Sequence, residues 1–356
     1  MKINFLLPHI RLSGGVKALL EYANRLNKIG HEVRVFVPRK APKWYQLLDK
    51  WAMRKHGLQS LLPEVVEWMD NTLAIEMFPE PGEHYLPDSD VIVASAWQNA
   101  EFAAQLPPQK GVFFYFILHY ESLWTRHKSR ATETYNLSCK MLTCSTWLKK
   151  TLIEKHEKKA DVLIIPVDRE VFFCDSKKWN AIHRIAMLHH DYDWKGYAEG
   201  IEAVKQVMQQ GRKIQLVVFG EKLEDPSSLF DSAGFEFEYH YRPTRARLRK
   251  IYTSCDIFLC PSWYEGLGLP SMEAMACRCA LVTANTGGCL DYAINGKTAL
   301  VSSSRDVKGL SKNIISLVED KALLESISQN GYDKVSEFDW QESCDQLASI
   351  FEKSLR

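Results

Sequence analysis

The sequence predicts an α/β protein with two doubly wound domains, each a parallel sheet between layers of helices. Short apolar runs rich in Val, Ile and Phe alternate with segments of helical periodicity along the whole chain. A strand, a helix and a second strand in this order form a βαβ unit, which implies a parallel sheet. The chain has 356 residues, too many for one ordinary core and about enough for two.

An N-terminal domain is expected over residues 1–170. Its strands are predicted at 3–7, 33–37, 73–77, 91–94, 112–118, 141–144 and 162–165, with a helix over 16–26. Residues 41–68 break this rhythm, are rich in Trp, Leu and Lys, and predict an inserted helical pair. The interdomain boundary is placed near residues 167–180, where the periodicity loosens.

A C-terminal domain is expected over residues 171–338. Its strands are predicted at 182–188, 214–219, 257–260, 280–284 and 299–301, and its helices at 197–208, 244–253, up to 276 and 307–318. A last helix, within 339–356, could pack back on the N-terminal domain. Open parallel sheets bind ligands beyond the C-terminal ends of their strands. The two Rossmann-like domains are therefore expected to face each other across a cleft.

Composition excludes several classes of protein. The formal net charge of +1 gives no bulk electrostatic attraction for nucleic acid. The nine cysteines include no CxxC pair, which favours reduced thiols in the cytoplasm over a zinc site or a disulfide framework. The opening run 2–7 is too short for a signal peptide, and no apolar stretch approaches the ~20 residues that span a bilayer. We expect a cytoplasmic protein, soluble or peripheral on the inner face of the membrane.

The strongest motif is the stretch Pro261–Ala276, which predicts a strand end, a turn and a helix. Gly266 and Gly268 let the backbone approach a ligand closely, and Pro270 is tolerated in a first helical turn. The free amides of that turn and the helix dipole favour a phosphate. Glu265 is predicted in the loop and Glu273 in the first turn, both facing one crevice, where a carboxylate can accept hydrogen bonds from a ribose or a sugar diol.

This stretch closely resembles the E-x7-E motif of glycosyltransferase family 4 (group 1), whose members have the GT-B fold. Residues 14–35, with Gly14-Gly15 at the start, resemble the family's opening glycine loop and helix, and Thr286-Gly287-Gly288 resembles its glycine pair. Tyr120-Glu121 and Thr134-Tyr135 are similar to rhamnosyltransferase-like members. The resemblance implies a retaining, metal-independent transfer of a sugar from a nucleotide diphosphate sugar to a glycan or lipid-linked glycan. The donor would be a substrate, and no cofactor or metal is expected.

The resemblance also implies roles for single residues in donor binding. Glu273 would bind the ribose and Glu265 the transferred sugar, while the amides of Gly266, Leu267, Gly268 and Leu269 would hold the sugar and the distal phosphate. Lys195 would neutralise the diphosphate. The family's usual arginine five residues earlier is His190 here, so either a protonated His190 or another cation takes its place.

Further donor contacts are implied elsewhere. The family places a backbone segment like Tyr241-Arg242 against the base, and Gly15 and His119 in the N-terminal domain against the diphosphate and the donor sugar. Glu265, Lys195 and His119 are the expected catalytic residues. Arg242, Arg245, Arg247 and Arg249 are spread around one helix, which predicts a solvated face.

Two further features of the sequence support weaker predictions. The run Lys149–Lys159 holds five lysines and, with Trp51, Leu58, Leu61, Leu62 and Trp68, could form a basic, apolar surface for lipid-linked acceptors at the membrane. Asp191 and Asp193 have the spacing of a metal-binding DxD motif, but they directly precede Lys195 in the phosphate loop, and we interpret the spacing as coincidence.

Two other classes share this fold type. An NAD-dependent oxidoreductase would need GxGxxG after the first strand, which Ser13–Lys17 does not supply. A two-domain small-molecule binding protein of the secreted type would need a signal peptide. Binding of a nucleoside diphosphate without binding of NAD would separate the transferase from both.

Overall fold

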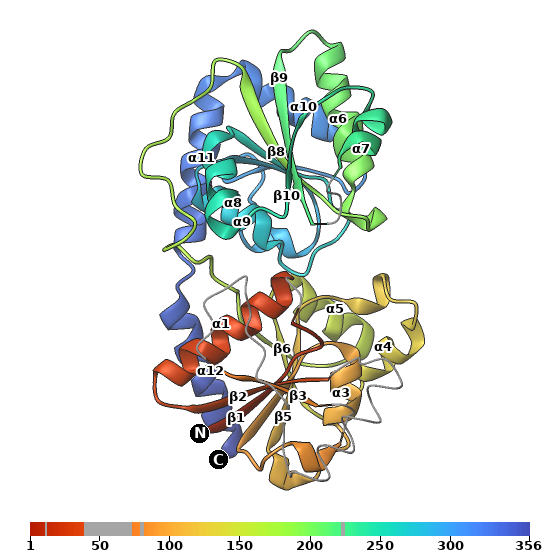
Figure 1. Ribbon diagram of the computed structural model, residues 1–356, viewed down its shortest axis with the longest axis vertical. Coiled ribbons are helices and arrows are strands. Elements are labelled where there is room, and N and C mark those ends of the chain that lie inside the picture. The colour runs from red at the N-terminus through yellow and green to blue at the C-terminus, as the bar shows by residue number, and fades with distance from the viewer. Residues whose placement is uncertain (11–12, 39–72, 79–81, 222–224) are drawn as a thin grey trace. The chain divides into compact units, whose positions relative to one another are not determined.

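The computed structural model describes residues 1–10, 13–38, 73–78, 82–221 and 225–356. The chain divides into two compact units, Met1–Ile164 with Gln341–Arg356 (unit 1) and Ile165–Trp340 (unit 2). Figure 1 shows that each unit is a parallel sheet with helices on both faces. The α/β fold class predicted from the sequence is confirmed. The helical pair predicted at 41–68 lies outside the described residues.

Unit 1 has a seven-stranded sheet in the order β3-β2-β1-β4-β5-β6-β7, with every neighbouring pair parallel. Its strands are β1 (Lys2–Leu6), β2 (Glu32–Pro38), β3 (Ile75–Phe78), β4 (Val91–Ala94), β5 (Val112–Ile117), β6 (Lys140–Thr143) and β7 (Asp161–Val162). Its helices are α1 (Gly14–Lys28), α3 (Trp97–Ala103), α4 (Lys128–Thr134), α5 (Thr146–His156) and α12 (Trp340–Leu355). The strands form because their apolar residues are buried on both faces of the sheet, as in β4 and β5.

The C-terminal helix α12 belongs to unit 1. It lies beside α1 on one face of the sheet (Figure 1), and the hydroxyls of Tyr22 and Ser343 are 2.6 Å apart. Phe351 meets Phe114 of β5 edge to face, with ring centroids 4.7 Å apart. The last helix therefore completes the core of the first unit.

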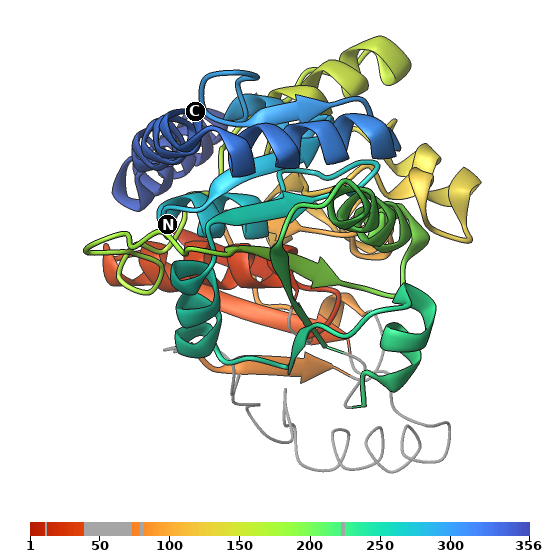
Figure 2. The same ribbon diagram turned by 90° about the horizontal axis from the view of Figure 1, so that it is seen from above.

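Unit 2 has a six-stranded sheet in the order β10-β9-β8-β11-β12-β13, again all parallel. Its strands are β8 (His183–His189), β9 (Ile214–Gly220), β10 (Glu238–Tyr241), β11 (Ile257–Cys260), β12 (Ala280–Ala284) and β13 (Leu300–Ser302). Its helices are α6 (Tyr197–Gln209), α7 (Ser227–Ala233), α8 (Arg245–Ser254), α9 (Leu269–Ala276), α10 (Val307–Glu319) and α11 (Lys321–Ser336). Helix α10 packs against α6 on one face, and α11 packs against α9 on the other (Figures 1 and 2).

The arginines of α8 form the solvated face that the sequence predicted only in part: Arg247 is exposed, whereas Arg245 and Arg249 are half-buried. Arg245 donates to the carboxylate of Asp168, and the guanidinium of Arg249 lies 3.3 Å from the ring centroid of Phe173. Arg249 also donates from Nε to the carbonyl of Phe173 at 3.1 Å. These contacts hold Asp168 and Phe173, which lie in the first segment of unit 2, against helix α8 of the same unit.

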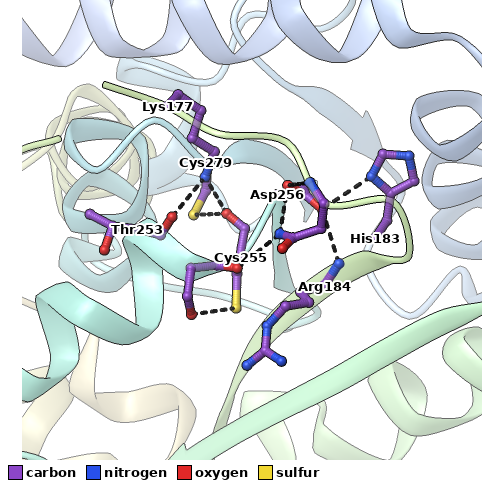
Figure 3. A network of polar contacts seen from close by, with 9 residues as sticks. Lys177, His183, Arg184, Thr253, Cys255, Asp256 and Cys279 are labelled. Atoms are coloured by element: carbon purple, nitrogen blue, oxygen red, sulfur yellow. Dashed lines mark hydrogen bonds and ion pairs between the residues drawn. The ribbon is translucent and has the colours of Figure 1, made fainter. Parts of the chain in front are cut away.

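A polar network fixes the next part of that segment at the N-terminal edge of the sheet (Figure 3). The fully buried carboxylate of Asp256 accepts hydrogen bonds at 3.0–3.2 Å from Asn180, His183 and Arg184. The Lys177 ammonium donates to the backbone carbonyl of Cys255. This polar network is structural and lies at the sheet edge opposite to the loops described next.

All nine cysteines of the chain are free thiols.

Candidate active site

Two loops meet at the C-terminal edge of the unit 2 sheet. One follows β8 (residues 190–196) and the other follows β11 (residues 261–268). The Lys195 ammonium donates to Oε1 of Glu265 at 2.7 Å, and the Ser262 hydroxyl donates to the same oxygen at 2.9 Å. Only 15% of the lysine side chain and 12% of the glutamate side chain are exposed. Two of the predicted catalytic groups, 70 residues apart, thus form one desolvated ion pair.

Backbone contacts hold the two loops in register. The amide of Trp263 donates to the carbonyl of Trp194 at 2.8 Å. Gly196, directly after Lys195, has φ +67°, and a Cβ there would lie 2.1 Å from the carbonyl oxygen of Pro261. The close approach of the loops therefore depends on the missing side chain at position 196.

We predict that Gly196→Ala destabilises the protein by roughly 1–3 kcal/mol more than Gly211→Ala, because overpacking adds to the cost of a positive φ. Gly211 is the matched control, since it has φ +80° with no atom within 4 Å of the added Cβ. Urea unfolding of both variants measures the difference. Equal losses of stability would show that the two loops tolerate a wider separation.

The glycine pair after β12 packs against the Glu265 loop. The amide of Glu265 donates to the carbonyl of Thr286 at 2.9 Å, and the amide of Gly288 donates back to the carbonyl of Glu265 at 3.3 Å. A Cβ at Gly288 would lie 2.1 Å from the carbonyl oxygen of Gly266. The E-x7-E stretch and the glycine pair, separate motifs in the sequence, are therefore parts of one structure.

Helix α9 begins at the end of the Glu265 loop. Gly268 is its N-cap with φ +90°, and Pro270 lies in the first turn, as predicted. The buried hydroxyl of Tyr292 donates to the carbonyls of Leu267 and Gly268 at 3.0 and 3.2 Å. Leu269 is the first residue of the helix. The loop is thus held rigid where its amides and the positive end of the helix dipole can receive an anion.

The placement of Glu273 in the first turn was wrong. It is the fifth residue of α9, no acidic residue lies in the first turn, and its side chain is buried. Burial, and then the charge of Glu273, raise the pKa of Tyr252 on α8 well above its usual range. Glu273 is therefore near enough to Tyr252 for its charge to act on that residue.

The structure bears on the two alternatives for His190. Its Nδ1 accepts a hydrogen bond from the backbone amide of Tyr192 at 3.2 Å, and its ring stacks on that of Tyr192 with centroids 4.4 Å apart. Protonation of Nδ1 would break this hydrogen bond. The contact thus favours a neutral imidazole that carries its proton on Nε2.

Tyr241 and Arg242 lie at the end of β10, separated from β11 by β9 and β8. The amide of Arg242 donates to the carbonyl of Gly220 at 2.8 Å, and Arg242 has the unusual φ of +43°. Tyr241 is 38% exposed. They share the C-terminal sheet edge with Lys195 and Glu265 without joining their hydrogen-bonded cluster.

In unit 1, Gly15 lies against the residue that directly precedes His119. A Cβ added at Gly15 would lie 3.0 Å from the Leu118 side chain, the residue directly before His119. Gly15 is in the first turn of α1, and His119 follows β5. Trp124 donates from its indole nitrogen to Nδ1 of His119 at 3.2 Å, so a neutral His119 carries its proton on Nε2. Gly15 comes after β1 and His119 after β5, so both lie at the C-terminal edge of this sheet.

Glu121 is a buried acid that entered the sequence prediction only as part of a resemblance. Its amide donates to the Tyr135 hydroxyl at 2.8 Å, and its carboxylate accepts from the amide of Trp97 at 3.5 Å. Burial raises the pKa of Glu121 to about 7, and the hydrogen bond from Trp97 opposes this only in part. A glutamate two residues after a predicted site histidine was a signal that the sequence offered.

The described ranges contain no group of three or more His, Cys, Asp or Glu side chains arranged to hold a metal ion. In the same ranges, no helix combines the length and apolarity that a membrane crossing requires.

Comparison with known proteins indicates the class of protein that this chain resembles. Residues 180–334, most of unit 2, match the family model described as "Glycosyl transferases group 1". Over its full length the chain is similar in structure to the sucrose-phosphate synthase from Thermosynechococcus elongatus (TM-score 0.77, 15% identity, 99% of this chain and 98% of that one). It is also similar to HepE from Anabaena, solved in complex with UDP and glucose (TM-score 0.77, 16% identity, 99% of each chain). The fold is GT-B, and residues 180–334 match the model of the group 1 glycosyltransferases.

Curated relatives match over a shorter range. The chain is 28% identical to the capsular polysaccharide biosynthesis glycosyltransferase CapM of Staphylococcus aureus over 169 residues, 46% of this chain and 44% of that protein. It is 26% identical to the N,N'-diacetylbacillosaminyl-diphospho-undecaprenol alpha-1,3-N-acetylgalactosaminyltransferase of Campylobacter jejuni subsp. jejuni serotype O:2, over 46% of this chain and 42% of that protein. The matched part thus covers less than half of each of these relatives.

Proposed function

We propose that this protein is a retaining glycosyltransferase that moves a sugar from a nucleotide diphosphate sugar to a glycan or lipid-linked glycan in cell-surface polysaccharide synthesis. The observation that carries the proposal is the Lys195–Glu265 ion pair beside the start of α9. A cation, a carboxylate and free helix amides in one desolvated place match a diphosphate joined to a polyhydroxylated ring. The names of the relatives and the UDP bound by HepE support the same substrate class.

In this proposal, the side chains of unit 2 stabilise the leaving group. Lys195 and the amides of Gly266–Leu269 would meet the charge that develops on the departing diphosphate. Glu265 would accept hydrogen bonds from the sugar, and Glu273 from the ribose. Gly15 and His119 of unit 1 would contact the diphosphate and the donor sugar, and Tyr241-Arg242 the base.

The acceptor hydroxyl would attack from the side of the leaving group, with the departing phosphate as the base. Retention predicts that the product keeps the anomeric configuration of the donor, which nuclear magnetic resonance of the product measures. Metal independence predicts that transfer continues in excess chelator. An inverted product or complete loss of transfer in chelator would contradict these parts of the proposal.

Peripheral contact with the inner membrane face is part of the proposal. On α5 and just after it, the exposed residues include lysines and one large apolar side chain, Lys149, Lys150, Ile153, Lys155 and Lys159. Lysines of this kind attract anionic lipids and would bring the enzyme to a lipid-linked acceptor.

The central test is a thermal-shift screen with UDP, GDP, dTDP and ADP. One of them should stabilise the protein selectively, because ligands that bind only the folded state raise its stability. Lys195→Ala should weaken binding of that nucleoside diphosphate about 30- to 100-fold and binding of the bare nucleoside less than threefold, because a buried charged hydrogen bond is lost. Isothermal titration calorimetry measures both affinities. If wild type binds none of the four nucleotides, the proposed function fails.

A further inference from the structure

The loop after β8 carries a run of stacked rings that ends at the Lys195–Glu265 pair. His190 stacks on Tyr192 (centroids 4.4 Å apart), Tyr192 on Trp194 (5.6 Å) and Trp194 on Tyr264 (5.2 Å), with interplanar angles of 17–24°. The last contact joins the β8 loop to the β11 loop, directly before Glu265. Apart from His190, the sequence alone predicted no role for these stacked rings.

Trp194 is the ring that contacts the catalytic cation. The Lys195 ammonium lies 4.4 Å from the centroid of Trp194 and 2.7 Å from Oε1 of Glu265. A cation over the face of an indole is attracted by the negative face of the ring, most strongly where water is excluded. Lys195 therefore has two partners here, one ionic and one aromatic.

We infer that Trp194 is a positioning residue, which holds the Lys195 ammonium at the diphosphate site while Glu265 accepts hydrogen bonds from the donor sugar. The inference rests on the proposed function. A lysine ammonium is a point charge on a flexible four-carbon stem, whereas arginine offers a rigid fork. His190 occupies the position of the family's arginine, and its Nδ1 already accepts from the Tyr192 amide. Lys195 must therefore be fixed by its surroundings, and the stacked indole supplies a fixed surface beside it.

Three variants test this role, with the nucleoside diphosphate that best stabilises the wild type as the probe. Trp194→Leu should weaken its affinity about five- to tenfold, because the aromatic contact is lost, and should change the affinity for the bare nucleoside less than twofold. Trp194→Phe should restore the affinity to within threefold of wild type. In a Lys195→Ala background, Trp194→Leu should have less than a twofold further effect, because the two residues act through one another.

Trp179→Leu is the matched control. Trp179 is also a half-buried tryptophan of unit 2 with a nearby ammonium, that of Lys177 at 5.4 Å, but it lies at the opposite edge of the sheet with the Asp256 network. This variant should keep wild-type affinity for the nucleotide. An equal loss for diphosphate and nucleoside in Trp194→Leu, or an undiminished loss in the Lys195→Ala background, would overturn the positioning role. Neither result would touch the proposed function, which fails only if wild type binds no nucleoside diphosphate.

Discussion

Replacing Glu265 by alanine is expected to lower kcat/KM for sugar transfer about 100- to 1000-fold, the cost of removing one preorganised polar group from a desolvated transition state. Glu265 accepts from both Lys195 and Ser262, so its carboxylate is fixed before substrate arrives. Affinity for the free nucleoside diphosphate should stay within threefold of wild type or rise. The reason is that the Lys195 ammonium loses a competing carboxylate and remains available to the phosphates. Steady-state kinetics and calorimetry on the same preparation measure the two quantities.

Ser262→Ala is the control that separates the effect of the Glu265 charge from the effect of the orientation of its carboxylate. It removes one hydrogen bond to Glu265 Oε1 and leaves the carboxylate and Lys195 in place, so a loss of about tenfold in kcat/KM is expected. If Glu265→Ala transferred sugar at the wild-type rate, the assignment of this carboxylate to the donor sugar would be wrong. If it lost nucleotide affinity as strongly as Lys195→Ala, its role would be structural.

Central strands such as β4 and β11 were predictable because each is an uninterrupted apolar run. Three elements of unit 2 were missed, α7, β10 and α11, and the last two have local reasons. Strand β10 (Glu238–Tyr241) is an edge strand with the sequence Glu-Tyr-His-Tyr, none of whose residues is fully buried. Helix α11 (Lys321–Ser336) buries small residues such as Ser328 and Gly331 between its apolar positions, which weakens the helical pattern. Both elements are stabilised by contacts with other elements, and these contacts cannot be predicted from their own sequences.

The same difference between local pattern and contacts with other elements decides which parts of the site were predictable. Motif spacing correctly placed Pro270 in the first turn of α9, because turn and helix are local. It did not place Glu273, since the exact start of the helix at Leu269 depends on the N-cap conformation of Gly268. It also missed the contact of Lys195 with Glu265, because a contact between two loops depends on the sheet that aligns them, and the contact with Trp194, because that depends on the conformation of the β8 loop.

Glu121→Gln is expected to remove a pH dependence of stability from unit 1. Burial raises the pKa of Glu121 from 4.5 to about 7, so its ionised form is disfavoured in the folded state. The stability that this group contributes is complete below pH 4.5 and is lost as the pH rises through 7. Between pH 5 and pH 8 the wild type should therefore lose about 2–3 kcal/mol of unfolding free energy that the variant keeps, since each tenfold change in proton affinity is worth about 1.4 kcal/mol.

The measurement is urea unfolding of the full chain at pH 5 and at pH 8. It gives the difference in unfolding free energy between the two pH values. Comparing each protein with itself cancels any constant cost of placing an amide among Trp97 and Tyr135. Glu154→Gln, at an exposed carboxylate on α5 of the same unit, should keep the wild-type dependence. An unchanged pH dependence in Glu121→Gln would mean that the carboxylate is hydrated or paired in solution. A reduced one would show that this unit holds a protonated acid at neutral pH, two residues from His119.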